Sequence, residues 1–309
     1  MKNLAIYFSS PGVMDYPFHD EAYYSAYQEV IRAVETSGDV QVFIVRGDSY
    51  QGSGKFSHGW RFVEGKQELF ENIEANLIFN RDDKNTIPKI YDCKIINHPE
   101  LDEICVDKFK TFERFPNLSP RTVYIHSFRE FLEQKEKWMG RDDEIIVLKK
   151  NFLTEGRGIY VQPIGEVREN LYEDWTNILM QEFMDSSLGI PGVIEGMHDL
   201  RVTVVNGEPI NSFVRTPKQG SYLANIAQGG KGMALDLEQV PQEVMDIVNT
   251  IQAGLSQYTP SLFAADFMNT TKGYQLVELN SRPGLQYPKI TKTYKKFNDA
   301  VAKMLLQAI

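Results

Sequence analysis

The sequence has few cysteines, no long apolar run and no excess of positive charge. Its two cysteines among 309 residues, Cys93 and Cys105, form no CxxC pair, which is typical of a reduced protein. No apolar segment approaches the ~20 residues that cross a bilayer. The 42 acidic residues outnumber the 33 basic ones and give a formal net charge of −9. This balance argues against a nucleic-acid binder or a polybasic membrane module, because both need a cationic face.

The amino-terminal segment lacks the pattern of a secretory leader, because the stretch "KNLAIYFSS" is short and strand-like. Together with the cysteine pattern, this predicts a cytoplasmic protein whose partners are small molecules or proteins. The hydrophobic fraction of 42% is ordinary for a globular chain, and the length predicts two or three domains.

The first hundred residues alternate between strand and helix patterns. An apolar run at 4–9 precedes helical spacing over 20–38, which stops at Gly38, and a second apolar run covers 40–45. This order predicts a βαβ unit in a parallel sheet, with later strands at 74–81 and 94–99. The segment "GDSYQGSGKFSHGW" (47–60) is expected to be a flexible or lid-like loop. It is no P-loop, because Ser49 and Phe56 stand where that motif needs Gly and Ser or Thr.

The middle of the chain predicts strands at 144–151, 159–165 and 177–184, with the glycine-bearing turn "FLTEGRG" between the first two. Glycines at such a turn can bring backbone N–H groups close to phosphate oxygens. An ordinary turn is the commoner interpretation. Farther on, Asn206-Gly207 between apolar alternations predicts a hairpin, a helix is expected at 241–255, and a solvated amphipathic helix closes the chain at 289–309.

Two further strands, 261–269 and 273–280, carry oxygen-bearing side chains. Alternation predicts that Glu278 and Asn280 share one face, whereas Val277 and Leu279 occupy the other. If the strands pair, Asp266 lies beside Glu278. Two carboxylates and an amide are the oxygen ligands expected for Mg²⁺ held against phosphates. A single buried acid is more often a salt-bridged structural residue, but two acids and an amide on adjacent strands favour a metal site.

The order of these segments resembles the ATP-grasp superfamily, especially the ribosomal-S6-modification and glutathione-synthetase type of carboxylate–amine ligase. The similarity covers roughly residues 100–290 and includes "HDLRVTVVNGEPINSFVR", "NIAQGGKG" and "LVELNSRPG". It implies an α/β fold: an amino-terminal parallel βαβ domain (1–100) followed by two α+β subdomains that enclose ATP. These are a central lid (101–184) and a carboxyl-terminal subdomain (185–309).

The resemblance implies a nucleotide site between the two later subdomains. Two lysines would reach the phosphates, with Lys110 or Lys150 as alternatives, and strand 177–184 would supply the hinge that lines the adenine. The implied nucleotide-binding residues are Lys108, Lys149, Thr154, Glu155, Gly156, Arg157, Gly158, Gln181, Glu182, Phe183 and Met184. Lone lysines are solvated surface residues in most proteins.

The resemblance also implies metal and substrate sites. Asp266, Glu278 and Asn280 would bind Mg²⁺ or Mn²⁺. The implied catalytic residues are Arg201 toward the phosphates or acyl group, Arg215 facing the acceptor, Asn225 beside the metals, and Arg282. Arginines on strands are usually surface residues that snorkel.

The implied activity is an ATP-dependent ligase that joins a small-molecule or peptide carboxylate to an amine through an acyl-phosphate. Two alternatives stay open: an ATP-grasp kinase acting on a hydroxyl, and an ATP-binding regulatory protein without turnover. No nucleic acid or membrane partner is expected, and a homo-oligomer is left open. Substrate specificity is expected in loops at the carboxyl ends of the first sheet's strands and in the segment "RTPKQGSYLANIAQGGKG" (215–232).

Overall fold

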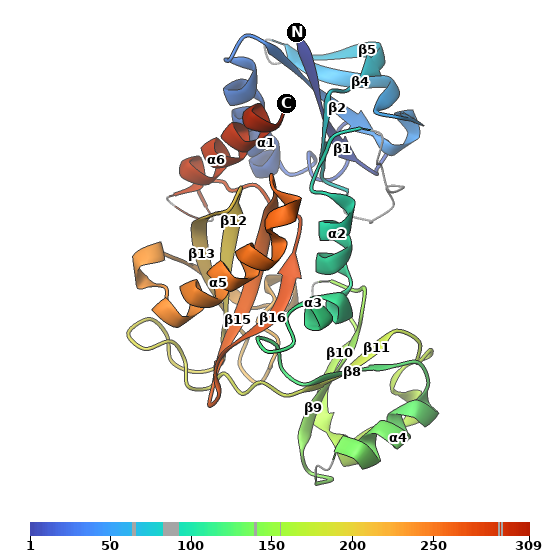
Figure 1. Cartoon of the computed structure of the whole chain (residues 1–309), viewed down its shortest axis with the longest axis vertical. Coiled ribbons are helices and arrows are strands. Elements are labelled where there is room, and N and C mark those ends of the chain that lie inside the picture. The colour runs from blue at the N-terminus through green and yellow to red at the C-terminus, as the bar shows by residue number, and fades with distance from the viewer. Residues whose placement is uncertain (64–65, 83–92, 139–140, 155, 290, 292) are drawn as a thin grey trace.

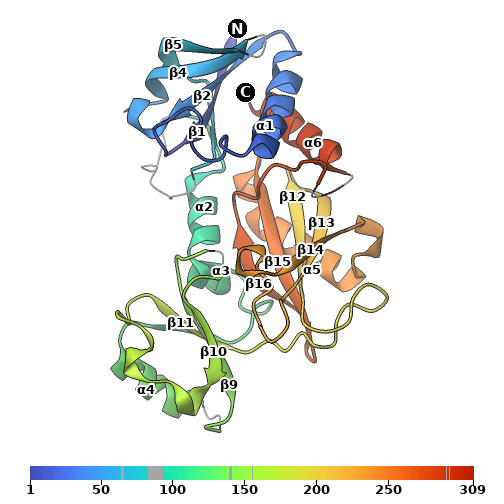
Figure 2. The ribbon, with the colours of Figure 1, turned by 180° about the vertical axis from the view of Figure 1, so that it is seen from behind.

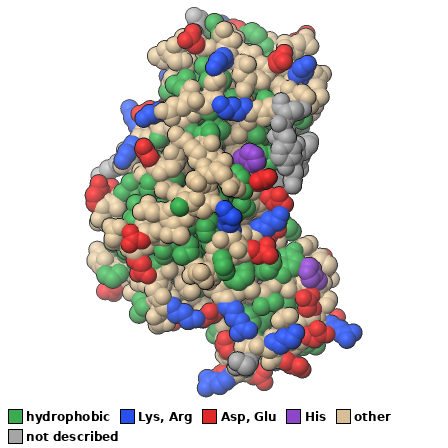
Figure 3. All heavy atoms as spheres, in the orientation of Figure 1, with side chains coloured by type: hydrophobic (Ala, Val, Ile, Leu, Met, Phe, Trp, Pro, Cys, Tyr) green, Lys and Arg blue, Asp and Glu red, His purple; other side chains and the backbone are tan. Residues whose placement is uncertain are grey.

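The computed structural model describes residues 1–63, 66–82, 93–138, 141–154, 156–289, 291 and 293–309. These residues form three β-sheets that follow one another along the long axis of the molecule (Figure 1). On the face drawn in Figure 3, positive and negative side chains are interspersed. None of the described helices is long and apolar enough to cross a membrane.

The amino-terminal sheet has the strand order β3-β4-β2-β1-β6-β7, and β5 pairs with β4. Its strands are β1 (Lys2–Phe8), β2 (Val40–Arg46), β3 (Tyr50–Gly52), β4 (Lys55–Val63), β5 (Lys66–Glu74), β6 (Leu77–Asn80) and β7 (Ile95–Ile96). Strands β1, β2, β6 and β7 are parallel. The predicted βαβ unit is confirmed: α1 (Glu21–Glu35) connects β1 to β2, and the Asp20 side chain accepts from the first backbone N–H groups of the helix.

The expected loop at 47–60 is wrong from Tyr50 onward, where the chain forms β3 and the start of the β4–β5 hairpin. The Gly/Ser composition of this segment did not reveal that Phe56 and Gly59 pack closely against neighbouring strands. Phe56 is fully buried against Tyr7 and Tyr50. At Gly59 a Cβ would come within 2.7 Å of the Ile73 side chain. Glycine therefore permits close strand packing here rather than flexibility.

The middle sheet is antiparallel in the order β10-β9-β11-β8. Its strands are β8 (Thr122–Ile125), β9 (Ile145–Lys150), β10 (Ile159–Pro163) and β11 (Ile178–Glu182). Helix α4 (Phe128–Trp138) buries Phe131 and Trp138 in the core of this sheet. Two short helices, α2 (Pro99–Val106) and α3 (Lys108–Arg114), connect the first sheet to the middle one (Figure 1).

The third sheet is antiparallel in the order β14-β13-β12-β15-β16. Its strands are β12 (Asp199–Val205), β13 (Glu208–Thr216), β14 (Lys231–Leu235), β15 (Leu262–Thr270) and β16 (Gly273–Asn280). The predicted hairpin turn is confirmed, because Asn206 and Gly207 both have positive φ, at 50° and 83°. Helix α5 (Gln242–Leu255) buries Val244, Val248 and Ile251 against this sheet. Short 3₁₀ turns are η1 (Gly47–Ser49), η2 (Ile164–Glu166), η3 (Glu169–Leu171), η4 (Ile226–Gln228), η5 (Leu237–Gln239) and η6 (Ser256–Tyr258).

The final helix, α6 (Tyr294–Ala308), returns to the amino-terminal sheet. It lies beside α1 (Figures 1 and 2), and its Phe297, Val301 and Leu305 share one core cluster with side chains of β1 and α1. The last helix of the segment predicted as the carboxyl-terminal subdomain thus packs against α1 as well as against β12 and β13. The domain limits stay a prediction.

Asn97, which follows β7, ties the first sheet to the third. Its amide nitrogen donates to the carbonyls of Leu262 and Ser281 at 2.7 and 2.6 Å, and its amide oxygen accepts from the Leu262 N–H at 2.7 Å. The side chain is 3% exposed. Buried hydrogen bonds of this kind are costly to leave unmade.

We predict that Asn97→Ala lowers the free energy of unfolding by about 3 kcal/mol, because a buried N–H and two carbonyls lose their partner. Urea denaturation monitored by circular dichroism measures the change. Asn170→Ala, at an exposed asparagine, is the matched control and should change stability little. Equal effects of the two substitutions would contradict the structural role of Asn97.

Candidate active site

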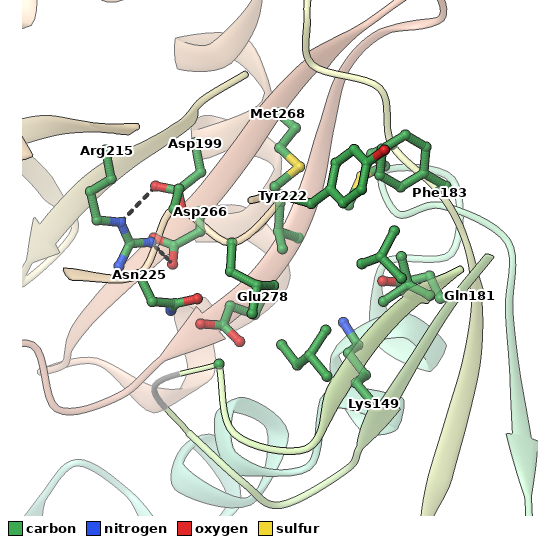
Figure 4. Close-up of a pocket in the computed structure, with 18 of the residues that line it drawn as sticks. Lys149, Gln181, Phe183, Asp199, Arg215, Tyr222, Asn225, Asp266, Met268 and Glu278 are labelled. Carbon is green, nitrogen blue, oxygen red and sulfur yellow. Dashed lines mark hydrogen bonds and ion pairs between the residues drawn. The ribbon is translucent and has the colours of Figure 1, made fainter. Parts of the chain in front are cut away.

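Two adjoining cavities lie where the three sheets meet. The first lies between the middle and third sheets (Figure 4). The second, of about 460 Å³, also has a wall from the amino-terminal sheet and α1. Five residues line both cavities and define their junction: Lys108, Thr154, Arg215, Asn225 and Glu278. The sequence analysis had predicted all five as site residues.

The first cavity has an apolar end. Val147 and Val161 line it from the middle sheet, and Met268 lines it from β15. The rings of Phe183 and Tyr222 meet edge to face at this end, with centroids 5.1 Å apart (Figure 4). A slot with aliphatic, thioether and aromatic walls suits a flat ring system such as a nucleobase.

Lys149 brings a buried cation to the first cavity. Its side chain extends from β9 toward Glu278 (Figure 4) and is 4% exposed. Burial lowers the pKa of Lys149 to about 8; Glu278 opposes this shift, and nearby Lys108 contributes to it. Lys108 donates to the carbonyls of Asn151 and Leu153 at 3.0 and 2.7 Å.

The alternative lysines point elsewhere. Lys110 pairs with Glu103, and Lys150 donates to the carbonyls of Asp174 and Thr176. Neither is among the residues that line the two cavities. The geometry therefore favours Lys108 and Lys149 over these alternatives.

A buried network of acids and arginines forms the wall of the third sheet. Asp266 on β15 accepts from Arg201 through both carboxylate oxygens, at 2.7 Å each, and from Arg215 at 2.7 Å. Arg215 also donates to Asp199 at 2.6 Å, as the dashed lines in Figure 4 show. Burial opposes ionisation of Asp266, but the two guanidinium groups outweigh it and hold the pKa of that carboxyl low.

Asp199 belongs to this network but was missed by sequence reasoning. It is 6% exposed and lies directly opposite Arg215 in the β12–β13 pair. Burial raises the pKa of Asp199, against the lowering effect of Arg215. One signal was available in the sequence: Asp199 and Arg215 lie at similar distances along the chain from the Asn206-Gly207 turn, as cross-strand partners do. Opposite charges at such positions stabilise a sheet.

Glu278 lies opposite Asp266 in the β15–β16 pair, as expected, but Val277 departs from the predicted alternation. A bulge follows Asp266, so that Phe267 pairs with Leu276 and Val277 is the extra residue. Val277 therefore lines the first cavity beside Glu278 instead of sharing the buried face of Leu279. The expectation that Val277 points away from Glu278 is wrong.

The glycine turn approaches the junction from the middle sheet. Gly156 has φ of 75°, and a Cβ there would come within 2.9 Å of the Asn225 side-chain oxygen. The Arg157 side chain instead hydrogen-bonds to Thr154. Gly158 does not line either cavity. Glu155, predicted to contact phosphates, lies outside the described residues.

The remaining predicted residues divide between the cavities. Gln181, Phe183 and Met184 line the first cavity. Arg201, Asn280 and Arg282 line the second. Glu182 is not one of the described residues that line the two cavities. Its carboxylate pairs with Lys272 instead. Its backbone N–H is also engaged, with the carbonyl of Arg121.

The donor set fits a divalent cation on one condition. Asp266, Glu278 and Asn280 offer the hard oxygen ligands that Mg²⁺ prefers. The Glu278 carboxylate makes no side-chain hydrogen bond or ion pair with a described residue, whereas the Asn280 oxygen accepts from the Arg282 N–H at 2.8 Å. The oxygens of Asp266 accept from three arginine N–H groups. The condition is competition with the arginines, which already occupy three of the roughly four lone-pair sites of the Asp266 carboxylate.

We predict opposite stability effects for the two facing carboxylates. Asp266→Asn should lower the free energy of unfolding by about 3 kcal/mol or more, because two buried guanidinium groups lose their counter-charge. Glu278→Gln, the matched control one strand away, should be neutral to mildly stabilising. Urea titration of both variants measures this, and a larger loss for Glu278→Gln would contradict the network described here.

The comparisons with known proteins agree with this geometry. A family model described as the RimK-like ATP-grasp domain matches residues 140–309, more than half of the chain. A probable alpha-L-glutamate ligase of Maridesulfovibrio salexigens is 27% identical over 243 residues, covering 72% of this chain and 71% of that protein. One from Stenotrophomonas maltophilia is 29% identical over 145 residues, and the match spans 44% of its length and 45% of this chain.

Solved structures share the fold at low sequence identity. A RiPP-associated ATP-grasp ligase of Chryseobacterium gregarium, solved with ADP and a leader and core peptide, superposes with a TM-score of 0.65 at 14% identity. The match covers 100% of this chain and 98% of that one. The expected ATP-grasp fold is therefore confirmed, and this chain belongs to the RimK-like ATP-grasp family.

Proposed function

We propose that this protein is an ATP-dependent ligase that joins a carboxylate to an amine. One observation carries the proposal: a cavity with an apolar end and a second, larger cavity meet at a junction lined by Lys108, Thr154, Arg215, Asn225 and Glu278. A nucleotide with its base in the first cavity would direct its phosphates to this junction. A substrate in the second cavity would meet the terminal phosphate there.

The charges at the junction suit a polyphosphate. Lys149 and Lys108 would hold phosphate oxygens from the side of the middle sheet, and Arg215 would hold them from the third sheet. Asp266, Glu278 and Asn280 would hold Mg²⁺ or Mn²⁺, which when bound neutralises charge on the phosphates. A phosphate that attracts the arginines would release Asp266 for this task.

The proposed reaction needs no protein nucleophile. A carboxylate oxygen of the substrate attacks the γ-phosphorus, a C–O–P linkage forms, and the bond to the β-phosphate oxygen breaks to release ADP. The amine then attacks the acyl carbon, phosphate leaves, and the nitrogen loses a proton. Arg215 and Asn225 would orient the carboxylate and stabilise the charge that develops.

We propose that the substrates are a small-molecule or peptide carboxylate and an amine. We also propose that the enzyme acts in the cytoplasm. Relatives bear the name alpha-L-glutamate ligase, so L-glutamate is the first amine to test. The kinase alternative differs in its product, a phosphorylated hydroxyl, and the regulatory alternative forms no product.

Hydroxylamine tests the ligase directly. With ATP, Mg²⁺ and a panel of carboxylic acids, we expect ADP release and a hydroxamate, because hydroxylamine is small and attacks an acyl-phosphate. Glu278→Gln should lower hydroxamate formation at least about 100-fold through the loss of an anionic ligand, while its fold persists. ADP release with a phosphorylated alcohol and no hydroxamate would support the kinase. ATP binding without ADP release across the panel would support a regulatory protein.

The pKa of Lys149 predicts how ATP affinity depends on pH. Lys149 is charged below pH 8, so affinity should be nearly constant there. Above pH 8 the free protein loses this charge, and phosphate binding must recover it, so affinity should fall, by at most tenfold per pH unit. Calorimetry at pH 7 and 9 should show a decrease of about tenfold.

Two variants distinguish the origin of that change. Lys149→Met should bind ATP weakly and with little pH dependence, whereas Lys110→Arg, whose side chain pairs with Glu103, should match the wild type. The same pH dependence in Lys149→Met and the wild type would assign the titration to another group.

A further inference from the structure

The wall that the amino-terminal sheet contributes to the second cavity contains a buried arginine. Arg81 directly follows β6, and its side chain is 6% exposed. Tyr23 and Tyr27, one turn apart on α1, line the same wall. Arg81, Tyr23 and Tyr27 have no role in the proposed nucleotide or metal site.

Among the described residues, Arg81 has no carboxylate partner of the kind that the cavity's other arginines have. Its Nε donates to the Tyr27 hydroxyl at 3.0 Å, and one Nη donates to the Pro283 carbonyl at 2.7 Å. The other Nη is buried without a hydrogen-bond acceptor. No ion pair joins Arg81 to an acid among the described residues, although Asp82 lines the same cavity.

The neighbouring arginines show the contrast. Arg201 and Arg215 pair with Asp266, and Arg282 pairs with Asp102 at 2.6 Å. A buried cation without a counter-charge is strongly unfavourable. Arg81 therefore has both the charge and the unused donor for an anion that arrives from outside the chain.

Tyr23 places a second donor on this wall. Its hydroxyl packs over Gly284, where a Cβ would lie 2.7 Å away, so only glycine leaves room for it. The hydroxyl makes no hydrogen bond with a described residue. Burial raises the pKa of Tyr23 to about 12; Tyr16, Tyr287 and Tyr27 contribute to this rise, and Arg81 opposes it. Tyr23 is therefore protonated at neutral pH and can donate to an anion.

We propose that Arg81 and Tyr23 bind a second anionic group of the carboxylate substrate, separate from the carboxylate that reacts. The inference rests on the proposed function, because it describes the substrate of that ligase. The cavity, of about 460 Å³, has room for an acid that reaches from the junction to this wall. The carboxylate substrate is accordingly an acid with at least two anionic groups.

A matched pair of acids tests this subsite. N-acetyl-L-glutamate and N-acetyl-L-glutamine have nearly the same size but differ by one carboxylate, and their blocked amines restrict them to the carboxylate role. Calorimetry in the presence of ADP should show at least tenfold tighter binding of N-acetyl-L-glutamate to the wild type, because charged hydrogen bonds are the strong ones.

The variants separate anion binding from structural support. Arg81→Lys loses the fork and should reduce the preference to below about threefold, while binding of N-acetyl-L-glutamine stays unchanged. Tyr23→Phe, which removes only an oxygen, should reduce the preference by about threefold. Tyr24→Phe is the control: it removes an oxygen from the same helix, outside the cavity lining, and should leave the preference intact.

Several outcomes would overturn the subsite. These are equal affinity of the wild type for the two acids, no binding of either acid, or an equal loss of affinity for both acids in Arg81→Lys and Tyr23→Phe. The ligase is judged separately by ADP release. A preference that depends on Arg81, without ADP release from any acid in the panel, would refute the ligase and leave the anion subsite standing.

Discussion

The buried pairing of Asp266 with Arg201 and Arg215 organises the whole site. It joins β12, β13 and β15 across one face of the third sheet, and Asp199 balances the charge that Asp266 leaves over. Buried charges persist only when their partners and hydrogen bonds are nearly complete, so the side chains of this network have little freedom. Glu278, opposite Asp266, stays outside the network and faces the cation of Lys149. The junction therefore combines a neutralised cluster with a carboxylate that pairs with no described side chain.

This arrangement links phosphate and cation binding. A phosphate at the junction offers Arg215 an alternative anion, and each N–H that leaves Asp266 returns a carboxylate lone pair to a cation. The cation in turn adds positive charge that attracts the phosphate. Each ligand thus lowers the cost of binding the other, which is positive coupling by linkage. A buried acid can be interpreted either as a structural ion-pair partner or as a metal ligand. Because Asp266 can exchange arginine N–H groups for a cation, one residue can have both roles.

The parts of the fold that local sequence could predict are those with local causes. The βαβ unit, the Asn206-Gly207 hairpin and the β15–β16 pair each depend on apolar spacing or turn residues a few positions apart. The bulge at Val277 depends on how two strands pack within the sheet, and Phe56 is buried by Tyr7 and Tyr50, which composition does not reveal. Arg81 escaped notice for the same reason: the lack of a counter-charge among the described residues around it is visible only when their side chains are placed.

The two cavities differ in how firmly their walls are joined. Asn97 and Arg81 connect the first sheet to the segment after β16 through hydrogen bonds to the carbonyls of Ser281 and Pro283, and α6 packs on α1. The second cavity is thereby built between bodies held by buried contacts. The middle sheet meets the rest through contacts such as Lys108 with the carbonyls of Asn151 and Leu153. Since Lys108 lines the junction, a phosphate that attracts this lysine competes with the bonds that anchor the glycine turn. The charge of the nucleotide therefore acts on the hydrogen bonds between Lys108 and the carbonyls of Asn151 and Leu153, and through them on the position of the middle sheet relative to the second cavity.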